Sequence, residues 1–360
     1  MKLKTFFFLI ILFFISCQKE EKNELLKFPK LDISFEKMNE NIHLGVDEPW
    51  ESIGIGYINV IQTDSIWHLW YESYDEKSRK VGRGDYNGYF CYANSSDGVN
   101  WNKPDLGLSS YNNETSNNIL ISNEGNKNGG IHGATVFIDS LAAPDERYKM
   151  VYARWVDGLS TNWIYGMVSP DGIHWNNERL LLKHYSDTQT VCFVHDGKYH
   201  LYVRYWDGDG HSDGFRQIGY TESKKFNSSF EEIKPVEVFN APEGDIHLYT
   251  NAARPINDSI YVIFPSIYFP AYDKMHLKLA YSGVNTPSKF YFNNYDSEYL
   301  IENSNDYRVV LAAPQSIRYS DNSFWLYYNG KKHGHRTSLN SYAGSLQRTL
   351  INIIPKENNL

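Results

Sequence analysis

The sequence predicts an all-β protein, and more narrowly a five-bladed β-propeller. One strand motif returns five times along the chain, and its aromatic and β-branched residues suit pleated, half-buried strands. The copies begin at Ile66, Arg147, Lys198, Ile260 and Phe324. Each copy follows another apolar strand and a tight polar turn, so hairpins recur about every 60 residues, which is typical of a repeat architecture.

The composition supports β structure and limits the kind of ligand. Aromatic residues are 16% of the 360 residues, and no segment of any length has the helical period. The formal net charge is −8, and no basic stripe stands out that would neutralise phosphates, which argues against a nucleic-acid binder. Sugar rings that stack on Trp and Tyr fit this composition better.

Each repeat unit is expected to supply four antiparallel strands. The innermost strands are expected at Tyr57–Ile61, Ala134–Ile138, Thr190–Val194, Thr250–Arg254 and Ala313–Ile317. A third strand follows the motif strand, at Gly88–Ala93, Trp163–Val168, Arg216–Thr221, His276–Tyr281 and, more weakly, Ser338–Ala343. A β-sandwich or a two-domain β protein is the alternative, but a sandwich rarely repeats one strand-turn-strand order so regularly.

Two units share the turn Ser-x-Asp-Gly-x-x-Trp, which contains Asp97-Gly98 in the first and Asp171-Gly172 in the second. Gly tolerates a positive φ angle and Asp accepts hydrogen bonds from its own turn, so the pair favours a tight turn. We therefore interpret this motif as structural rather than catalytic.

The N-terminus is expected to direct export. Residues 1–17 combine a short basic region, an apolar run too short to span a bilayer, and a final Cys17. Phe14-Ile15-Ser16-Cys17 resembles a bacterial lipobox, and the acidic residues that follow resemble the export signal of Bacteroidetes surface lipoproteins. The expectation is an outer-membrane lipoprotein anchored at Cys17 and facing the cell exterior, with a periplasm-facing protein or an ordinary secretory peptide as alternatives. Residues 18–42 would be a charged tether, and residues 43–355 the propeller domain.

Propeller geometry predicts where a ligand would bind. The first strand of each blade is innermost, and the residues before it share one face with the loops after the second strand. Those positions hold ionisable and aromatic residues in all five units, whereas the opposite hairpins are ordinary solvated turns. Charges that converge on one axis are costly unless they are paired or functional. A funnel on that face is therefore the expected ligand site.

The candidate site residues are carboxyl groups, and polar or aromatic groups that would contact a substrate. Arginine suits bidentate recognition of hydroxyl or carboxylate groups, and histidine can donate to a substrate, titrate or bind a metal. The candidate carboxyl groups are Glu51, Asp187 and Asp245, and the candidate substrate-binding residues are Trp50, His132, Arg154, Arg204, Arg216, His247, Tyr249 and His333. Taken singly, each has a structural alternative as a turn cap, an inter-blade ion pair or a core residue.

A family resemblance rests on this architecture, on the two Asp-Gly turns and on the phrase Glu146-Arg147-Tyr148-Lys149-Met150. From His43 to about Pro355 the chain resembles the five-bladed propeller glycoside hydrolases, which include families 43, 62, 32, 68 and 117. None of the shared motifs is catalytic. The Asp-Pro-Asn, Arg-Asp-Pro and Glu-Cys motifs of invertase-type enzymes are absent, so fructan cleavage is not expected.

The resemblance implies hydrolysis of a glycosidic bond in a poly- or oligosaccharide by paired carboxyl groups. In the resembling families these groups stand at the openings of different blades, which matches Glu51, Asp187 and Asp245 here. We expect Asp187 and Asp245 to be catalytic, and Glu51 to be a third carboxylate or a ligand of a sugar hydroxyl. The expected partner is a carbohydrate and the expected state a monomer. No cofactor is required, and a divalent cation at the axis is left open.

Three other functions fit the same fold. A non-catalytic glycan-binding lipoprotein would have aromatic platforms without two carboxylates across a sugar-sized gap. A sialidase-like hydrolase would need three arginines converging on one point, with a Tyr-Glu nucleophile pair. A structural or adhesive surface protein would have funnel charges without a chemical role.

Overall fold

The computed structural model describes residues 30–36, 42–64, 66–80, 88–122, 130–156, 158–159, 161–209, 212–240, 247–283, 285–292, 308–335 and 344–356. Segment 1–17 with Cys17, most of the predicted tether and the candidate Asp245 lie outside these residues. In the part that is described, no helix is long and apolar enough to cross a membrane. Strands dominate this part, as expected from the aromatic and β-branched repeat.

The first three blades are antiparallel sheets of four strands each in the described chain. Blade one contains β2 (Gly54–Thr63), β3 (Ile66–Tyr74), β4 (Tyr89–Ser95) and β5 (Ile119–Ser122). Blade two contains β6 (His132–Ile138), β7 (Tyr148–Val156), β8 (Thr161–Ser169) and β9 (Asn176–Leu182). Blade three contains β10 (Val191–His195), β11 (Lys198–Trp206), β12 (Arg216–Ser223) and β13 (Lys234–Pro235). The short helices η1 (Pro49–Glu51), α2 (Glu76–Lys80) and η3 (Pro144–Glu146) lie in the connections.

Blade four is built around one long, interrupted hairpin. Ile260 pairs with Gly283 at one end and Phe269 with Lys274 at the other, in a single unbroken register. The interruptions divide the hairpin into β17 (Ile260–Ile263), β18 (Ser266–Phe269), β19 (Lys274–Leu277) and β20 (Ala280–Gly283). The inner strand is likewise divided, into β15 (His247–Leu248) and β16 (Arg254–Pro255), and the outer strands are β21 (Lys289–Phe292) and β14 (Glu237–Phe239). At one end of this blade, β15, β18 and β19 belong to the same hydrogen-bonded sheet as the strands of blade five.

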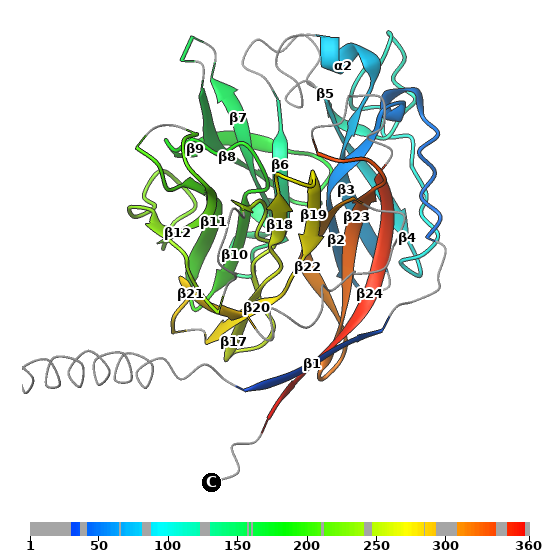
Figure 1. Ribbon diagram of the computed structural model, residues 1–360. Helices are drawn as coiled ribbons and strands as arrows, with labels where there is room; N and C mark the ends of the chain where they lie inside the picture. The colour runs from blue at the N-terminus through cyan, green and yellow to red at the C-terminus, as the bar shows by residue number, and fades with distance from the viewer. Residues whose placement is uncertain are drawn as a thin grey trace, which may run out of the picture.

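Blade five joins the two ends of the chain. Its strands β22 (Val309–Ser320), β23 (Ser323–Lys331) and β24 (Gly344–Pro355) come from the C-terminal part, and β1 (Leu31–Glu36) completes it from the N-terminal part. Figure 1 shows β1 lying along β24. This corrects the predicted tether, because Leu31–Glu36 lies inside residues 18–42. The alternation of Leu31, Ile33 and Phe35 with polar residues has the strand period.

Five hydrophobic clusters of described residues join neighbouring blades around the ring. For example, Trp70 of blade one packs with Tyr148 and Met150 of blade two in one cluster. Similar clusters join blades two and three, three and four, and four and five. A further cluster returns from blade five to blade one, with Tyr327 against Trp67. The aromatic residues of the repeated strand are therefore inter-blade core, and the ring is closed.

The Asp-Gly turns connect blades as well as strands. Ser95 and Asp97 accept hydrogen bonds from the backbone of their own turn, at 2.7 to 3.2 Å. The Gly98 carbonyl then accepts a hydrogen bond from Tyr327 of blade five at 2.8 Å. In blade two the Gly172 carbonyl accepts from Trp70 of blade one at 2.7 Å. Both glycines have positive φ angles, of 73° and 76°, so the structural interpretation of these turns is supported.

Side-chain amides close the propeller axis at mid-depth. Gln315 donates to Asn59 Oδ1 at 3.1 Å and accepts from the Val60 backbone at 3.2 Å. Gln189 donates to the Ala312 carbonyl at 2.9 Å and accepts from the Ala252 backbone at 3.0 Å. We call Asn59, Gln189 and Gln315 the amide plug. It links inner strands of all five blades, because Asn59 also bonds Ala134 and Val136 of blade two.

Candidate active site

Two arginines and three further side chains form a compact group at the end of the axis where the first strands begin. The arginine–aromatic cluster consists of Asp187, Arg204, Trp206, Arg216 and Tyr249. The Arg204 guanidinium lies 4.7 Å from the centre of the Tyr249 ring, and that of Arg216 lies 4.7 Å from the centre of the Trp206 ring. The Arg204 Nε atom is 3.5 Å from Asp187 Oδ1. Blades three and four thus meet at a positively charged, aromatic surface.

Strand periodicity and pairing explain the cluster. Arg204 and Trp206 are two residues apart on β11, so their side chains leave the same face. Trp206 pairs with Arg216 across the β11–β12 hairpin, which brings the second guanidinium to the same place. Tyr249 follows β15 of the next blade, and its carbonyl accepts a hydrogen bond from Arg204 Nη2 at 2.9 Å. Three of the predicted substrate-binding residues are therefore brought together with Asp187.

Several polar atoms of this cluster are buried without a hydrogen-bond partner among the described residues. They are Asp187 Oδ1, Arg204 Nε and Nη1, Arg216 Nε and Trp206 Nε1. Buried polar groups are normally satisfied, so a group of unsatisfied ones is a recognised mark of a site that binds a ligand. The Asp187 side chain is 28% exposed, which leaves it within reach of solvent.

A second group pairs a carboxylate with a histidine. Glu72 near the end of β3 is 1% exposed, and its Oε2 lies 3.1 Å from His132 Nδ1 at the start of β6. Glu72 also accepts from the Tyr74 hydroxyl at 2.6 Å and from the Ala134 backbone at 3.3 Å. These three contacts fix the carboxylate and, through it, the orientation of the imidazole.

Tyr57 connects the two groups. Its ring packs edge-on against His132 with 4.8 Å between ring centres, and its hydroxyl is 3.2 Å from Thr188 Oγ1. Thr188 is the residue after Asp187. Tyr57 has a φ angle of 44°, a strained conformation for a bulky residue and one that tends to occur at functional sites. A chain of contacts through His132, Tyr57 and Thr188 therefore leads from Glu72 in blade one to the segment that holds Asp187 before blade three.

Desolvation shifts the pKa values of several groups here. Desolvation lowers the pKa of Arg216, and the neighbouring Arg204 charge lowers it further. Desolvation raises the pKa of Tyr185, which donates to Asp187 Oδ2 at 3.4 Å, to about 12. The pKa of His335 falls to about 4, first through desolvation and then through the Arg216 charge, so this imidazole is neutral at pH 7.

Two of the predicted histidines differ in position. His247 lies within the site, and its Nδ1 accepts a hydrogen bond from the Arg216 backbone at 2.9 Å. His333 is exposed. Two residues later, His335 packs against Tyr249 and Tyr268 with ring centres 4.8 and 5.1 Å apart.

Three other predicted residues have partners of their own elsewhere in blades one and two. Both oxygens of Glu51 are occupied, one by the Tyr71 hydroxyl at 2.6 Å and the other by Lys103 Nζ at 2.6 Å. Trp50 donates to Asn118 at 3.1 Å in the core. Arg154 forms an ion pair with Glu178. The structure does not bring these residues to the arginine–aromatic cluster.

Sequence reasoning missed the importance of Glu72, Tyr57 and His335. Glu72 lies near the end of the first repeated strand, at a position where the propeller pattern predicts a funnel residue, so the sequence did contain a signal for it. The pairing with His132 depends on a contact 60 residues away, which no local pattern reveals. Among the described residues, no group of three or more His, Cys, Asp or Glu side chains is arranged to hold a metal ion.

Solved structures with a similar fold act on carbohydrates. One is an N-acetylgalactosamine deacetylase from F. plautii in complex with blood group B trisaccharide. It has 10% identity and a TM-score of 0.61, over 89% of this chain and 95% of that chain. Another is an α-L-arabinofuranosidase from Podospora anserina in complex with cellotriose, with 10% identity and a TM-score of 0.52 over 89% and 96%. A family 117 glycoside hydrolase from Zobellia galactanivorans also has 10% identity and a TM-score of 0.52, over 91% and 92%.

The chain shares the five-bladed propeller fold of these carbohydrate-active proteins. The predicted fold class is thereby confirmed. No protein-family model matches the sequence, and no curated protein matches it. Each structural comparison covers nearly the full length of this chain and of the compared chain, so the shared fold accounts for most of each compared chain.

Proposed function

We propose that this chain is a glycosidase that hydrolyses a bond in an oligo- or polysaccharide at the end of the axis where Glu72 and Asp187 lie. The proposal is supported by two carboxyl groups from different blades, Glu72 and Asp187, which are linked through His132, Tyr57 and Thr188, and by the unsatisfied donors and aromatic rings beside Asp187. Glycosidic cleavage needs one carboxyl group to protonate the leaving oxygen and another to act as base or nucleophile. Asp245, two residues before His247, is predicted from the sequence to be catalytic together with Asp187, and it lies outside the described residues.

The charge of the arginine–aromatic cluster favours an acidic sugar. Arg204 and Arg216 face one carboxylate, Asp187, among the residues of the cluster, so the cluster has one excess positive charge. Their unpartnered N–H groups suit a carboxylate or sulfate, and the Trp206 and Tyr249 rings suit the face of a sugar. We propose a substrate with an acidic group near the cleaved bond.

The test is turnover by carboxylate variants on a panel of acidic and neutral oligosaccharides. Glu72→Gln and Asp187→Asn each keep the shape of the side chain and remove its charge, so kcat should fall by about 10²–10⁴-fold while Tm stays near that of the wild type. Asp245→Asn tests the third carboxyl group in the same assay. Glu51→Gln is the matched control, because Glu51 is a buried carboxylate with partners of its own. Full activity in both the Glu72 and the Asp187 variant would refute the proposal.

A second candidate function is removal of an acyl group from a sugar. The buried Glu72–His132 pair is an arrangement in which a carboxylate orients an imidazole that activates water. The structural neighbour with a TM-score of 0.61 carries the name of an N-acetylgalactosamine deacetylase. Acetate release without new reducing ends would favour this function, whereas new reducing ends favour the glycosidase. We further propose that the protein works as an outer-membrane lipoprotein anchored at Cys17.

A further inference from the structure

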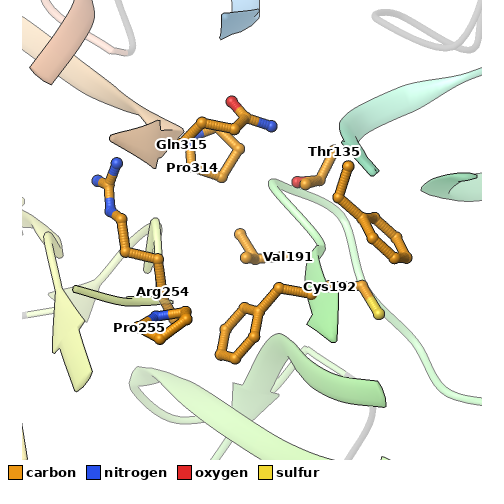
Figure 2. Close-up of a pocket in the computed structure, with 10 residues that line it drawn as sticks. Thr135, Val191, Cys192, Arg254, Pro255, Pro314 and Gln315 are labelled. Atoms are coloured by element: carbon orange, nitrogen blue, oxygen red, sulfur yellow. The ribbon is translucent and has the colours of Figure 1, made fainter. Parts of the chain in front are cut away.

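A cavity lies on the other side of the amide plug from the candidate active site. Its volume is about 180 Å³, and it is bounded by residues further along the inner strands, including Thr135, Val191, Arg254, Pro314 and Gln315. One water needs about 10–15 Å³ on the same measure, so the cavity has room for a ligand of several atoms. Figure 2 shows Arg254 and Thr135 on opposite sides of it, with Val191 and Pro314 between them.

Arg254 is a buried cation that lacks a counter-ion in the described chain. It is 4% exposed, and its Nε and Nη1 atoms have no hydrogen-bond partner, while Nη2 donates to the Ala313 carbonyl at 3.1 Å. The guanidinium also lies 4.6 Å from the centre of the Phe264 ring. Burial lowers the pKa of Arg254 from its ordinary 12.5 to about 9. An unpaired buried charge strongly destabilises the folded state, so binding of a group of opposite charge would stabilise the folded protein.

The remaining polar lining also fits a negatively charged occupant. The Thr135 hydroxyl is buried without a partner among the described residues, so it is able to donate a hydrogen bond. The Gln315 amide is already bonded to Asn59, Val60 and Val136. No carboxylate is among the described residues that line the cavity. Positive charge and a free hydroxyl, with no competing acid, select an anion over a cation.

We propose that this cavity binds a small oxyanion, such as phosphate or a short carboxylate, with Arg254 as the main anchor and Thr135 as a second donor. The site is separate from the proposed glycosidase site, because the amide plug lies between them. Thr135 comes from blade two and Arg254 from blade four, so a bound anion ties opposite sides of the ring together. Its effect is on the stability of the ring, since a ligand that binds the folded state alone stabilises it.

The experiment measures Tm and calorimetric affinity of the full chain in phosphate, acetate and chloride at equal ionic strength. In the wild type, phosphate or acetate should raise Tm with the logarithm of its concentration, and chloride should not. Whichever of phosphate and acetate binds more tightly identifies the oxyanion as inorganic or carboxylic. Equal stabilisation by chloride, or none by any anion, would overturn the proposal.

Variants separate the cavity from general salt effects. Arg254→Met should abolish the oxyanion dependence, and Thr135→Val, which keeps the shape of the side chain, should weaken affinity about tenfold through loss of one charge-assisted hydrogen bond. Arg318→Met is the control, because Arg318 is an exposed arginine paired with Asp321 on the surface, and it should keep the wild-type affinity. If Arg254→Met does not fold, Thr135→Val decides alone: unchanged affinity in it contradicts the site.

Discussion

Glu51 and Glu72 are both buried glutamates of blade one, yet their surroundings give them opposite roles. Glu51 is paired with Lys103, and the Lys103 side chain is only 11% exposed. The contacts that fix Glu72 come from the Tyr74 hydroxyl, the His132 imidazole and the Ala134 backbone, and none of them is with a lysine or an arginine. A carboxylate held by a lysine is an element of structure, whereas one held against a titratable imidazole can take part in proton transfer. The contacting side chain, Lys103 for Glu51 and His132 for Glu72, distinguishes the two glutamates, and their degree of burial does not.

The Glu51–Lys103 ion pair gives a prediction about stability and pH. Lys103→Met should cost about 3–5 kcal/mol of unfolding free energy at pH 7, because it leaves a buried carboxylate without its counter-charge. Desolvation already raises the pKa of Glu51. Without Lys103 that folded-state pKa rises further above the unfolded value, so the penalty is present at high pH and fades as Glu51 becomes protonated on acidification. Urea unfolding at several pH values measures this.

The control for this pair is the double variant Glu51→Gln with Lys103→Met. It removes both charges, so it should recover most of the loss at pH 7 and show no such pH dependence. A loss in Lys103→Met that is equal at pH 7 and pH 4.5 would contradict the ionic explanation.

At the scale of elements, the Asp-Gly turn is a junction between blades and not merely a reversal of the chain. Desolvation works to raise the pKa of Asp171, but hydrogen bonds from His174, Ile173 and Ser169 outweigh it and lower the pKa to about 2. The turn so formed presents the Gly172 carbonyl to Trp70 of the previous blade. Loss of the carboxylate should therefore loosen two blades at once.

Asp171→Ala should lower the free energy of unfolding by about 1 kcal/mol at pH 7, a discounted value because the side chain is 43% exposed. The folded pKa is depressed, so the stabilisation is complete above the unfolded value near 3.8 and is lost as the pH falls towards 2. The difference between wild type and variant should thus shrink over that range in denaturant titrations. A difference that stays constant with pH would assign the effect to turn propensity alone.

The sequence predicted features that repeat locally and missed those that depend on distant pairing. The strand-turn-strand repeat and the two Asp-Gly turns are visible in short windows, and the blades follow from them. The contact between Glu72 and His132 joins residues 60 positions apart, and the contact between Glu51 and Lys103 joins residues 52 positions apart. Both glutamates fit the same pattern, so the choice between them required the folded chain.

At the scale of the whole molecule, β1 closes the ring. It pairs with β24 over its full length, from Leu31 opposite Pro355 to Glu36 opposite Leu350. Leu31 is buried, and Ile33 and Phe35 pack against the same cluster between blades four and five. The alternation of these residues is visible in the local sequence, but the pairing of this strand with β24, far along the chain, is not.

Removal of β1 should destabilise the propeller measurably. A chain that begins at residue 38 loses the burial of three apolar side chains, which at about 1.5–3 kcal/mol for each fully buried one, less for partial burial, suggests a loss of about 2–5 kcal/mol. It also exposes the edge of β24, so aggregation should increase. A chain that begins at residue 25 keeps β1 and is the matched control. Equal Tm values for the two would show that β1 contributes little to closure.

The closure of blade five also sets the order in which the protein can be completed during synthesis. β1 is synthesised before every other strand of the described chain, and its partner β24 is synthesised after all of them. Blades one to four can form before β24 is made. Until then β1 lacks its partner, so its strand edge and its three apolar side chains remain exposed. Blade five can therefore be completed only after β24 has been synthesised, and β1 must avoid pairing wrongly until then.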